Sequence, residues 1–198
     1  MKLPVLQYGH PILRAKGKRV DKIDNRIREL AQNMLETMHA ANGVGLAAQQ
    51  VGEAVQLTVL DISQVEDRPS TMRLKGQDVD PKSAMPLVLI NPEIKLGDET
   101  EIGTEGCLSF PEITGEIERT KSVVLSAQNL ESAKVEIEAS GLLARAIQHE
   151  VDHLNGILFV DRMSSAAKAA LSSRLKRLQR ETQRGTQHRQ MLVSETTL

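Results

Sequence analysis

Residues 141–154 form a segment that has to become a helix in the interior of the protein. The first half of this segment is apolar. Directly after the segment come Asn155 and Gly156, which are typical of a helix end. Its second half carries His149, Glu150 and His153. Because buried imidazoles and carboxylates need partners, the rest of the chain has to fold around this helix and supply them.

Patterns elsewhere in the sequence predict an α+β domain around that helix. Apolar residues recur at helical spacing from 24 to 41, which predicts an N-terminal helix. Short strands and turns are expected between 55 and 139, except in the polar stretch 63–85, which is typical of a long loop. Another helix is predicted over 164–183. Strands in the middle favour small antiparallel sheets packed around the central His-Glu-x-x-His helix, with an N-terminal and a C-terminal helix.

Composition excludes several classes of protein. The 198 residues, 40% apolar and 26% charged with a net charge of −1, are typical of one globular domain with a tail. Aromatic residues make up only 2%, which argues against modules that stack bases on aromatic side chains. We find no apolar run long enough for a membrane-spanning helix and no signal peptide. The single cysteine, Cys107, excludes an internal disulfide framework, so a reducing compartment is expected.

The sequence His149-Glu150-Val151-Asp152-His153 predicts a metal site. Residues four apart on a helix project from one face, so both imidazoles can reach a single ion. Glu150 lies between them, where it can act on a water at the metal. The alternative is a surface helix with two solvated histidines, which the apolar residues before His149 disfavour.

A catalytic metal usually has three protein ligands, and the common downstream ligands are missing here. One class of protease with this motif places a third histidine where this chain has Phe159. Another takes a glutamate further on, and no acidic residue occurs between 164 and 180. Cys107 is the upstream candidate, because thiolates bind zinc or iron and the glycine beside it allows close approach. Taken alone, a single cysteine is more often a small buried apolar residue.

A third element is the small-residue segment 43–50, which contains Gly43, Gly45 and Gln50. It has no lysine and so does not fit a phosphate-binding loop. By itself it is typical of a tight turn after a helix, although the Gln50 amide could donate to a substrate oxygen.

Together and in this order, the three elements resemble the peptide deformylase family. The family pattern Gly-x-Gly-x-Ala-Ala-x-Gln stands here at 43–50, Glu-Gly-Cys-Leu-Ser at 105–109, and Gln-His-Glu-x-Asp-His-Leu-x-Gly at 148–156. The resemblance starts at 8–14 and extends to Met163. It implies a metal-dependent amide hydrolase that removes the formyl group from the N-terminal formyl-methionine of newly made proteins and releases formate.

The resemblance also implies roles for the site residues. Cys107, His149 and His153 would hold one divalent metal ion, Fe²⁺ in the cell and Zn²⁺, Ni²⁺ or Co²⁺ in some preparations. Glu150 would move the proton of the attacking water, while the Gln50 amide and the Leu108 N–H would stabilise the oxyanion. The substrate-binding positions are Val44, Gly45, Leu142, Arg145 and Ala146.

Arg145 departs from the apolar residue common in the family. It lies four residues before His149, on the same stripe of the helix, and Glu105 belongs to the cysteine motif. We therefore expect an ion pair between Arg145 and Glu105, the alternative being an arginine that lies along the surface. Gln148 and Asp152 are expected to orient the ligands.

The C-terminal part of the sequence is strongly basic, with seven Lys or Arg residues and one acid between 164 and 190. Leucines at helical spacing predict a basic amphipathic helix over 164–183, next to a deformylase domain of residues 1–163 and a disordered tail over 184–198. This asymmetry favours an anionic partner, and the family resemblance points to ribosomal RNA. A solvated basic face is the alternative.

Two other functions stay open at the level of sequence. One is a general metallopeptidase of the His-Glu-x-x-His type, against which the missing downstream ligand counts. The other is a ribosome-binding homologue without catalysis, which would usually have lost Glu150, Gln50 or Cys107. We expect N-formylmethionyl nascent peptides as partners, no DNA and no membrane. The expected location is the bacterial cytoplasm, or an organelle stroma or matrix after removal of a transit peptide.

Overall fold

The strands form two antiparallel sheets in this computed structural model, which describes the backbone of residues 1–195 and the side chains of residues 1–186. A seven-stranded sheet has the spatial order β1-β2-β5-β8-β9-β3-β4. Its members are β1 (Gly45–Ala47), β2 (Leu57–Leu60), β3 (Ser70–Leu74), β4 (Gln77–Val79), β5 (Leu87–Leu96), β8 (Ser122–Gln128) and β9 (Lys134–Ser140). A separate hairpin pairs β6 (Thr100–Gly106) with β7 (Thr114–Thr120). The predicted α+β class with antiparallel sheets is confirmed.

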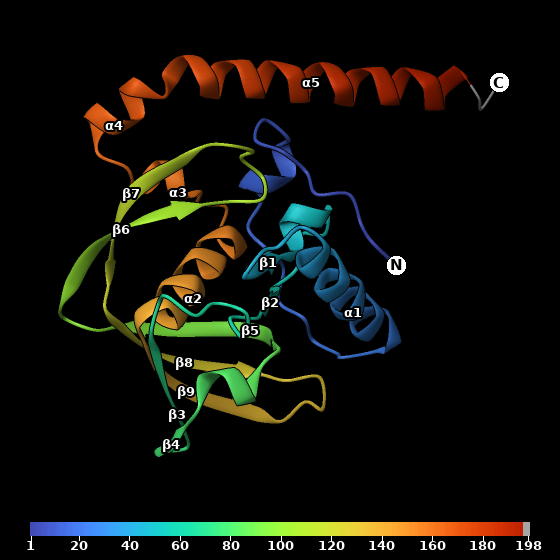
Figure 1. Cartoon of the computed structure of the whole chain (residues 1–198). Coiled ribbons are helices and arrows are strands. Elements are labelled where there is room, and N and C mark those ends of the chain that lie inside the picture. Colours follow the sequence, from blue (N-terminus) through green and yellow to red (C-terminus); the bar gives the residue numbers. More distant parts are fainter. Residues whose placement is uncertain (196–198) are drawn as a thin grey trace.

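The helices lie around these sheets (Figure 1). α1 (Asn25–Ala40) begins where the Asp24 side chain accepts a hydrogen bond from Ile27 N, and it packs on β1 and β2. α2 (Gly141–Leu154) lies between the large sheet and the β6–β7 hairpin. The chain then forms α3 (Phe159–Arg162), α4 (Ser165–Ala170) and α5 (Ser172–Glu195), which crosses the top of the molecule in Figure 1. Short 3₁₀ helices span Pro11–Arg14, Ala48–Val51 and Pro81–Ala84.

The interior position of α2 follows from its sequence. All its residues from Leu142 onward are buried, and its apolar side chains share a core cluster with residues of β8 and β9 such as Leu125 and Ile137. Gly141 starts the helix with φ of +66°, and a Cβ there would lie 2.2 Å from the Pro69 carbonyl oxygen. Only glycine fits this backbone without strain, so the start of α2 is fixed against the loop before β3.

A second cluster joins the C-terminal helix to the turn after β6. Phe110 stacks on Tyr8 with ring centroids 4.8 Å apart and meets Phe159 edge-on at 5.0 Å. Leu175 of α5 packs into the same cluster and is 6% exposed. The first turns of α5 are therefore part of the apolar core beside the cysteine turn.

Two segments differ from the sequence-based expectations. Residues 63–85 are not simply a long loop, because they contain β3, β4 and a short helix, and β3 pairs with β9. The helix predicted over 164–183 is two helices with a turn at Leu171, and α5 continues to Glu195, beyond the predicted start of the tail. Residues 196–198 lie outside the described residues, and the division into domains stays a prediction. Within the described chain, no helix has the length and apolarity needed to cross a bilayer.

Candidate metal centre

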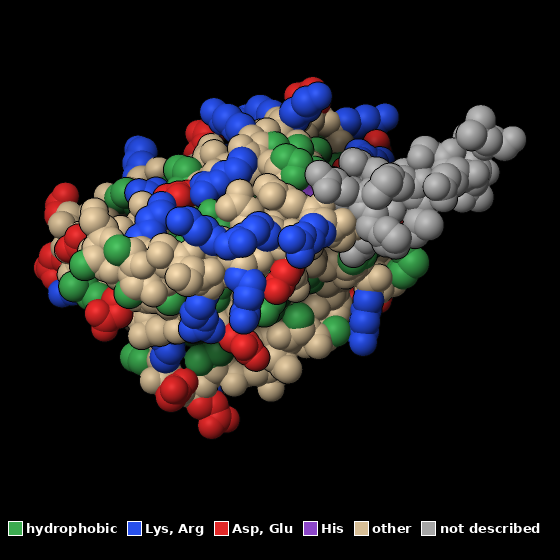
Figure 2. Space-filling view, turned by 90° about the horizontal axis from the view of Figure 1, so that it is seen from above, with side chains coloured by type: hydrophobic (Ala, Val, Ile, Leu, Met, Phe, Trp, Pro, Cys, Tyr) green, Lys and Arg blue, Asp and Glu red, His purple; other side chains and the backbone are tan. Residues whose placement is uncertain are grey.

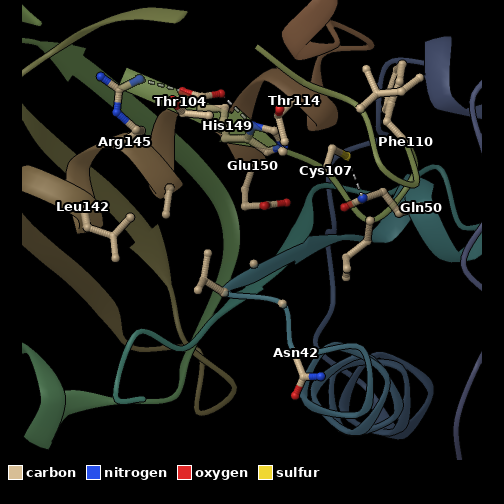
Figure 3. A pocket seen from close by; sticks show the side chains of 18 of the residues that line it. Asn42, Gln50, Thr104, Cys107, Phe110, Thr114, Leu142, Arg145, His149 and Glu150 are labelled. Atoms are coloured by element: carbon tan, nitrogen blue, oxygen red, sulfur yellow. Dashed lines mark hydrogen bonds and ion pairs between the residues drawn. The ribbon is translucent and has the colours of Figure 1, made fainter. Parts of the chain in front are cut away.

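Three side chains with metal-binding atoms meet where α2 faces the turn after β6. Figure 3 shows two of them, Cys107 and His149. The donor atoms of Cys107, His149 and His153 all lie within 4.8 Å of one another. Cys107 Sγ is 3.3 Å from His153 Nε2. Because Cys107 directly follows β6 and both histidines lie on α2, the site joins two separate elements of the fold.

These side chains fit a divalent cation. Burial, reinforced by the neighbouring His149, lowers the pKa of His153 well below its usual value, so this imidazole stays neutral. Burial would lower the pKa of His149 as well, but its contacts with Cys107 and Glu105 raise it well above its usual value. Neutral imidazole and thiolate are the forms that bind zinc and iron, so a metal that binds here would displace the proton of His149. Glu150 Oε2 is buried and has no hydrogen-bond partner among the described residues. Three converging ligands beside a carboxylate oxygen that lacks a protein partner are what a catalytic metal and its water require.

The carboxyl group of Glu150 is held in a buried and confined position. Burial raises the pKa of Glu150 to about 7. Gly45 of β1 lies against it so closely that a Cβ at this position would be 2.3 Å from Glu150 Oε1. A carboxyl group with a pKa near neutrality can both accept a proton and give it back.

His149 is oriented by a second carboxylate, that of Glu105. His149 Nδ1 lies 2.9 Å from Glu105 Oε2, which leaves Nε2 for a metal. Burial alone would raise the pKa of Glu105, but hydrogen bonds from His149 and Arg119 hold it down at about 2. Glu105 is therefore a permanent anion behind the ligand, whereas Glu150 is not.

A buried network of charges surrounds Glu105. Arg119 on β7 donates to both Glu105 oxygens, at 2.9 and 3.1 Å, and also to Asp152. Arg145 donates to Glu105 Oε1 at 2.9 Å, so the expected ion pair is present. Arg162 forms a further ion pair with Asp152. Arg119 and Arg162 belong to none of the sequence motifs, although the alternating pattern of β7 places Arg119 on the same inward face as Ile117.

The sequence predicts that Gln148 and Asp152 orient the ligands, but their hydrogen bonds go to Thr120, Arg119 and Arg162 and not to the histidines. Gln148 bonds to the main-chain oxygen of Thr120 at 2.9 Å, and the Thr120 N–H donates to the Gln148 amide oxygen at 3.2 Å. Asp152 reaches His149 only through Arg119 and Glu105. Gln148 connects α2 to β7, and Asp152 connects α2 to both β7 and α3.

The Gln50 amide points at the cysteine. Its Nε2 lies 3.4 Å from Cys107 Sγ and 3.2 Å from Ser109 Oγ. Its Oε1 accepts from Ala47 N at 2.9 Å, which fixes the orientation of the amide. Leu108, the other predicted oxyanion donor, follows Cys107 in the same turn.

A cavity of about 500 Å³ opens beside these groups (Figure 3). The structure places all five predicted substrate-binding residues along it: Val44, Gly45, Leu142, Arg145 and Ala146. Gln50, Leu108, Cys107, His149 and Glu150 line it as well. Sequence reasoning did not foresee Arg68 and Phe110, which reach it from the loop before β3 and from the turn after β6. The site therefore combines three converging metal-binding side chains with a cleft large enough for a side chain of substrate.

Comparisons with known proteins agree on one family. The sequence matches the family model described as polypeptide deformylase over residues 2–169. The peptide deformylase of Opitutus terrae is 42% identical over 184 residues, covering 92% of this chain and 95% of that protein. That of Methylacidiphilum infernorum is 43% identical over 180 residues, covering 91% and 94%.

Solved structures give the same result. The crystal structure of peptide deformylase from Thermotoga maritima superimposes with a TM-score of 0.70 at 40% identity, covering 83% of this chain and 99% of that one. A plant peptide deformylase reaches a TM-score of 0.80 at 37% identity, covering 93% and 92%.

Proposed function

The chain belongs to the polypeptide deformylase family, and we propose that it removes the formyl group of N-formylmethionyl peptides at the site of Cys107, His149 and His153. The reaction is hydrolysis of a formyl amide, which releases formate and a free amino terminus. One observation carries the assignment of the site: three ligand atoms within 4.8 Å of one another lie beside the cavity that contains Glu150.

The chemistry of the ligands supports a divalent metal. When bound there, such an ion would lower the pKa of a water and polarise the formyl oxygen. One thiolate with two imidazoles suits iron and zinc in particular. We propose Fe²⁺ as the ion used in the cell, by resemblance to the family, with Zn²⁺, Ni²⁺ or Co²⁺ able to replace it in preparations.

Glu150 is the proposed proton carrier. A pKa of about 7 lets its carboxylate take a proton from the attacking water and return it to the leaving amine. The Gln50 amide, fixed by Ala47 N, and the Leu108 N–H are the proposed donors to the oxyanion. Donors that are already oriented need no rearrangement when the negative charge develops.

The cavity wall supports recognition of methionine. Val44, Leu142 and Ala146 give it an apolar surface close to the ligands. A formyl carbon carries only hydrogen, so a narrow site beside the ligands would admit it and exclude larger acyl groups.

The test is a comparison of substrates on the metal-loaded protein. We expect formate release from a formyl-methionyl peptide, and acetate release from the acetyl-methionyl analogue that is lower by at least about a hundredfold. Cleavage of internal peptide bonds in an unformylated peptide would favour the general metallopeptidase instead. Equal hydrolysis of both acyl groups would contradict the proposed pocket.

We further propose that α5 presents a basic face to ribosomal RNA. Lys and Arg side chains gather along α5 in Figure 2, while Leu171, Leu175 and Leu178 face the apolar cluster below. The exposed basic residues of this face are Arg174, Lys176, Arg177, Arg180 and Arg184. Phosphate contacts of this kind weaken steeply with salt. Such a partner, together with bacterial relatives, supports the bacterial cytoplasm as the site of action.

Sedimentation with ribosomes tests this partner. Replacing Lys176, Arg180 and Arg184 with Glu should abolish cosedimentation at low salt without changing formate release from a short peptide. A matched variant carries Glu at Lys2, Lys22 and Lys95, which are exposed and lie outside α5. Binding that ignores salt, or that the matched variant loses equally, would contradict the proposal.

A further inference from the structure

The metal ligands come from two elements whose separation has to be fixed. Cys107 follows the last residue of β6, and His149 and His153 lie on α2. β8 and β9 of the large sheet pack on the apolar side of α2, and the large sheet does not contain the cysteine strand. Besides the bonds of Gln50 to the cysteine turn, the distance from the thiolate to the imidazoles depends on the contacts between α2 and the β6–β7 hairpin.

Arg145 makes the most extensive of these contacts through a single side chain, which is 3% exposed. Its Nη1 donates to Glu105 Oε1 and to the Ile117 carbonyl oxygen, both at 2.9 Å. Its Nη2 donates to the Glu101 carbonyl oxygen at 3.0 Å. Because Glu101 and Glu105 belong to β6 and Ile117 to β7, one guanidinium from α2 holds both strands of the hairpin.

A glycine on β6 makes room for that guanidinium. A Cβ at Gly103 would lie 3.0 Å from both Cζ and Nη2 of Arg145. Gly103 does not have the left-handed backbone conformation that would itself call for glycine. A side chain at this place would therefore require the guanidinium to shift by a few tenths of an ångström.

The guanidinium is turned away from the substrate cavity. In Figure 3 it points away from Glu150 and Cys107, toward the strand that carries Thr104. The part of Arg145 available to line the cavity is then its aliphatic stem, and the charge is used within the protein. This contact pattern differs from the substrate-binding role that the sequence suggested for Arg145.

We propose that Arg145, accommodated by Gly103, is a positioning residue that sets the metal site. It clamps the β6–β7 hairpin to α2 and so fixes Cys107 relative to the two histidines. Through Glu105 it also fixes the ring of His149. The inference rests on the proposed metal site but not on the identity of the substrate.

The first experiment removes the guanidinium and keeps the stem. In Arg145→Met, Glu105 retains Arg119 and His149 as partners, while the clamp between the elements is lost. We expect Co²⁺ affinity, measured by competition with a chelator, to fall by about ten- to a hundredfold. The visible absorption of bound Co²⁺ should change, and kcat should fall while KM for a formyl-methionyl peptide stays nearly constant.

Two further variants separate positioning from general damage. Arg145→Lys keeps the charge near Glu105 but has all its donors on one nitrogen, without the planar fork that reaches acceptors on both strands. Its Co²⁺ affinity should therefore lie between those of the wild type and Arg145→Met. Arg73→Met is the matched control, because Arg73 also donates to a carboxylate and a carbonyl oxygen, those of Glu138 and Gly76, at the remote edge of the large sheet. Its Co²⁺ affinity and spectrum should equal those of the wild type.

A double-mutant cycle tests the pairing with Gly103 and stays decisive if Arg145→Met folds poorly. Gly103→Ala forces the guanidinium to shift, so it should weaken Co²⁺ binding when Arg145 is present. In the Arg145→Met and Arg145→Lys backgrounds the same substitution should weaken Co²⁺ binding less. Wild-type Co²⁺ affinity and spectrum in folded Arg145→Met would overturn the proposal. The proposal would also be overturned if the effects of Gly103→Ala and Arg145→Met on the free energy of Co²⁺ binding were fully additive. If the wild type released no formate, the proposed function would be contradicted, but the measurements of Co²⁺ binding would still test the role of Arg145.

Discussion

Two buried carboxyl groups of this site differ in charge because their partners differ. Glu105 contacts two guanidinium groups and an imidazole. Burial would raise its pKa, but the hydrogen bonds and charges of His149 and Arg119 hold it at about 2. Burial raises the pKa of Glu150 to about 7, and its Oε2 has no partner in the described part of the chain. Residue type and motif alone do not distinguish Glu105 from Glu150. Their different hydrogen-bond partners suit Glu105 to orienting His149 and Glu150 to moving a proton.

Glu150→Gln tests the second role at the scale of one residue. The amide has nearly the same shape, so Cys107, His149 and His153 should bind metal as in the wild type. Formate release should fall by about a hundredfold to ten-thousandfold, because the amide cannot carry the proton. Metal content by mass spectrometry and formate release on the same sample check this. Turnover close to that of the wild type would rule out Glu150 as the proton carrier.

At the scale of elements, the sequence predicts those parts whose signals are local. α2 has the predicted bounds of 141–154, because an apolar pattern lies between Gly141 and Asn155-Gly156. Its two histidines and Cys107 come together as their motifs suggest. The strands β3 and β4 were missed because they form an exposed edge of the sheet, where Met72 is buried among polar neighbours. The role of Arg119 was missed for another reason, since its partners lie on two other elements and no local pattern names them.

Gly141→Ala tests how strictly α2 is placed. The new Cβ would meet the Pro69 carbonyl oxygen at 2.2 Å, and φ of +66° disfavours alanine. We expect the free energy of unfolding to fall by more than about 1 kcal/mol in urea titrations. Gly185→Ala is the control, because no atom lies within 4 Å of a Cβ there and Gly185 is part of α5. That variant should be as stable as the wild type or more so.

Leu175→Ala tests the docking of α5 on the core. Leu175 is 6% exposed in the cluster that contains Phe110, so its truncation should leave a cavity and lower the free energy of unfolding by about 2–3 kcal/mol. The exposed Arg180 provides a control, since Arg180→Ala should change stability by no more than about 0.5 kcal/mol. Equal stability of both variants would show that α5 does not depend on this contact.

At the scale of the whole molecule, the N-terminal segment is tied to the region after α2. The Asp161 carboxylate of α3 accepts from the Arg14 guanidinium and, at 2.9 Å, from Leu158 N. Burial alone would raise the pKa of Asp161, but these hydrogen bonds and the charge of Arg14 hold it below its usual value. The ionised form is therefore favoured by folding, and its stabilisation is present above the pKa of the unfolded chain.

Asp161→Asn should accordingly lower the free energy of unfolding by about 1 kcal/mol near neutral pH. As the pH falls through the depressed pKa of Asp161, the wild type loses this contribution and the two stabilities converge. Urea titrations from neutral to acidic pH measure the difference. Asp98→Asn is the control at an exposed position: its free energy of unfolding should differ from that of the wild type by the same small amount at every pH. A constant gap at every pH would mean that the charge of Asp161 is not responsible.

The position of the single tyrosine gives this protein an optical signal of its own. The chain has no tryptophan, so ultraviolet emission excited near 280 nm comes from Tyr8. Tyr8 stacks on Phe110, and Phe110 lines the cavity beside Cys107. A peptide or inhibitor that shifts Phe110 on entering the cavity changes the surroundings of the only fluorophore. Occupancy can then be followed in real time, without a label and without waiting for product.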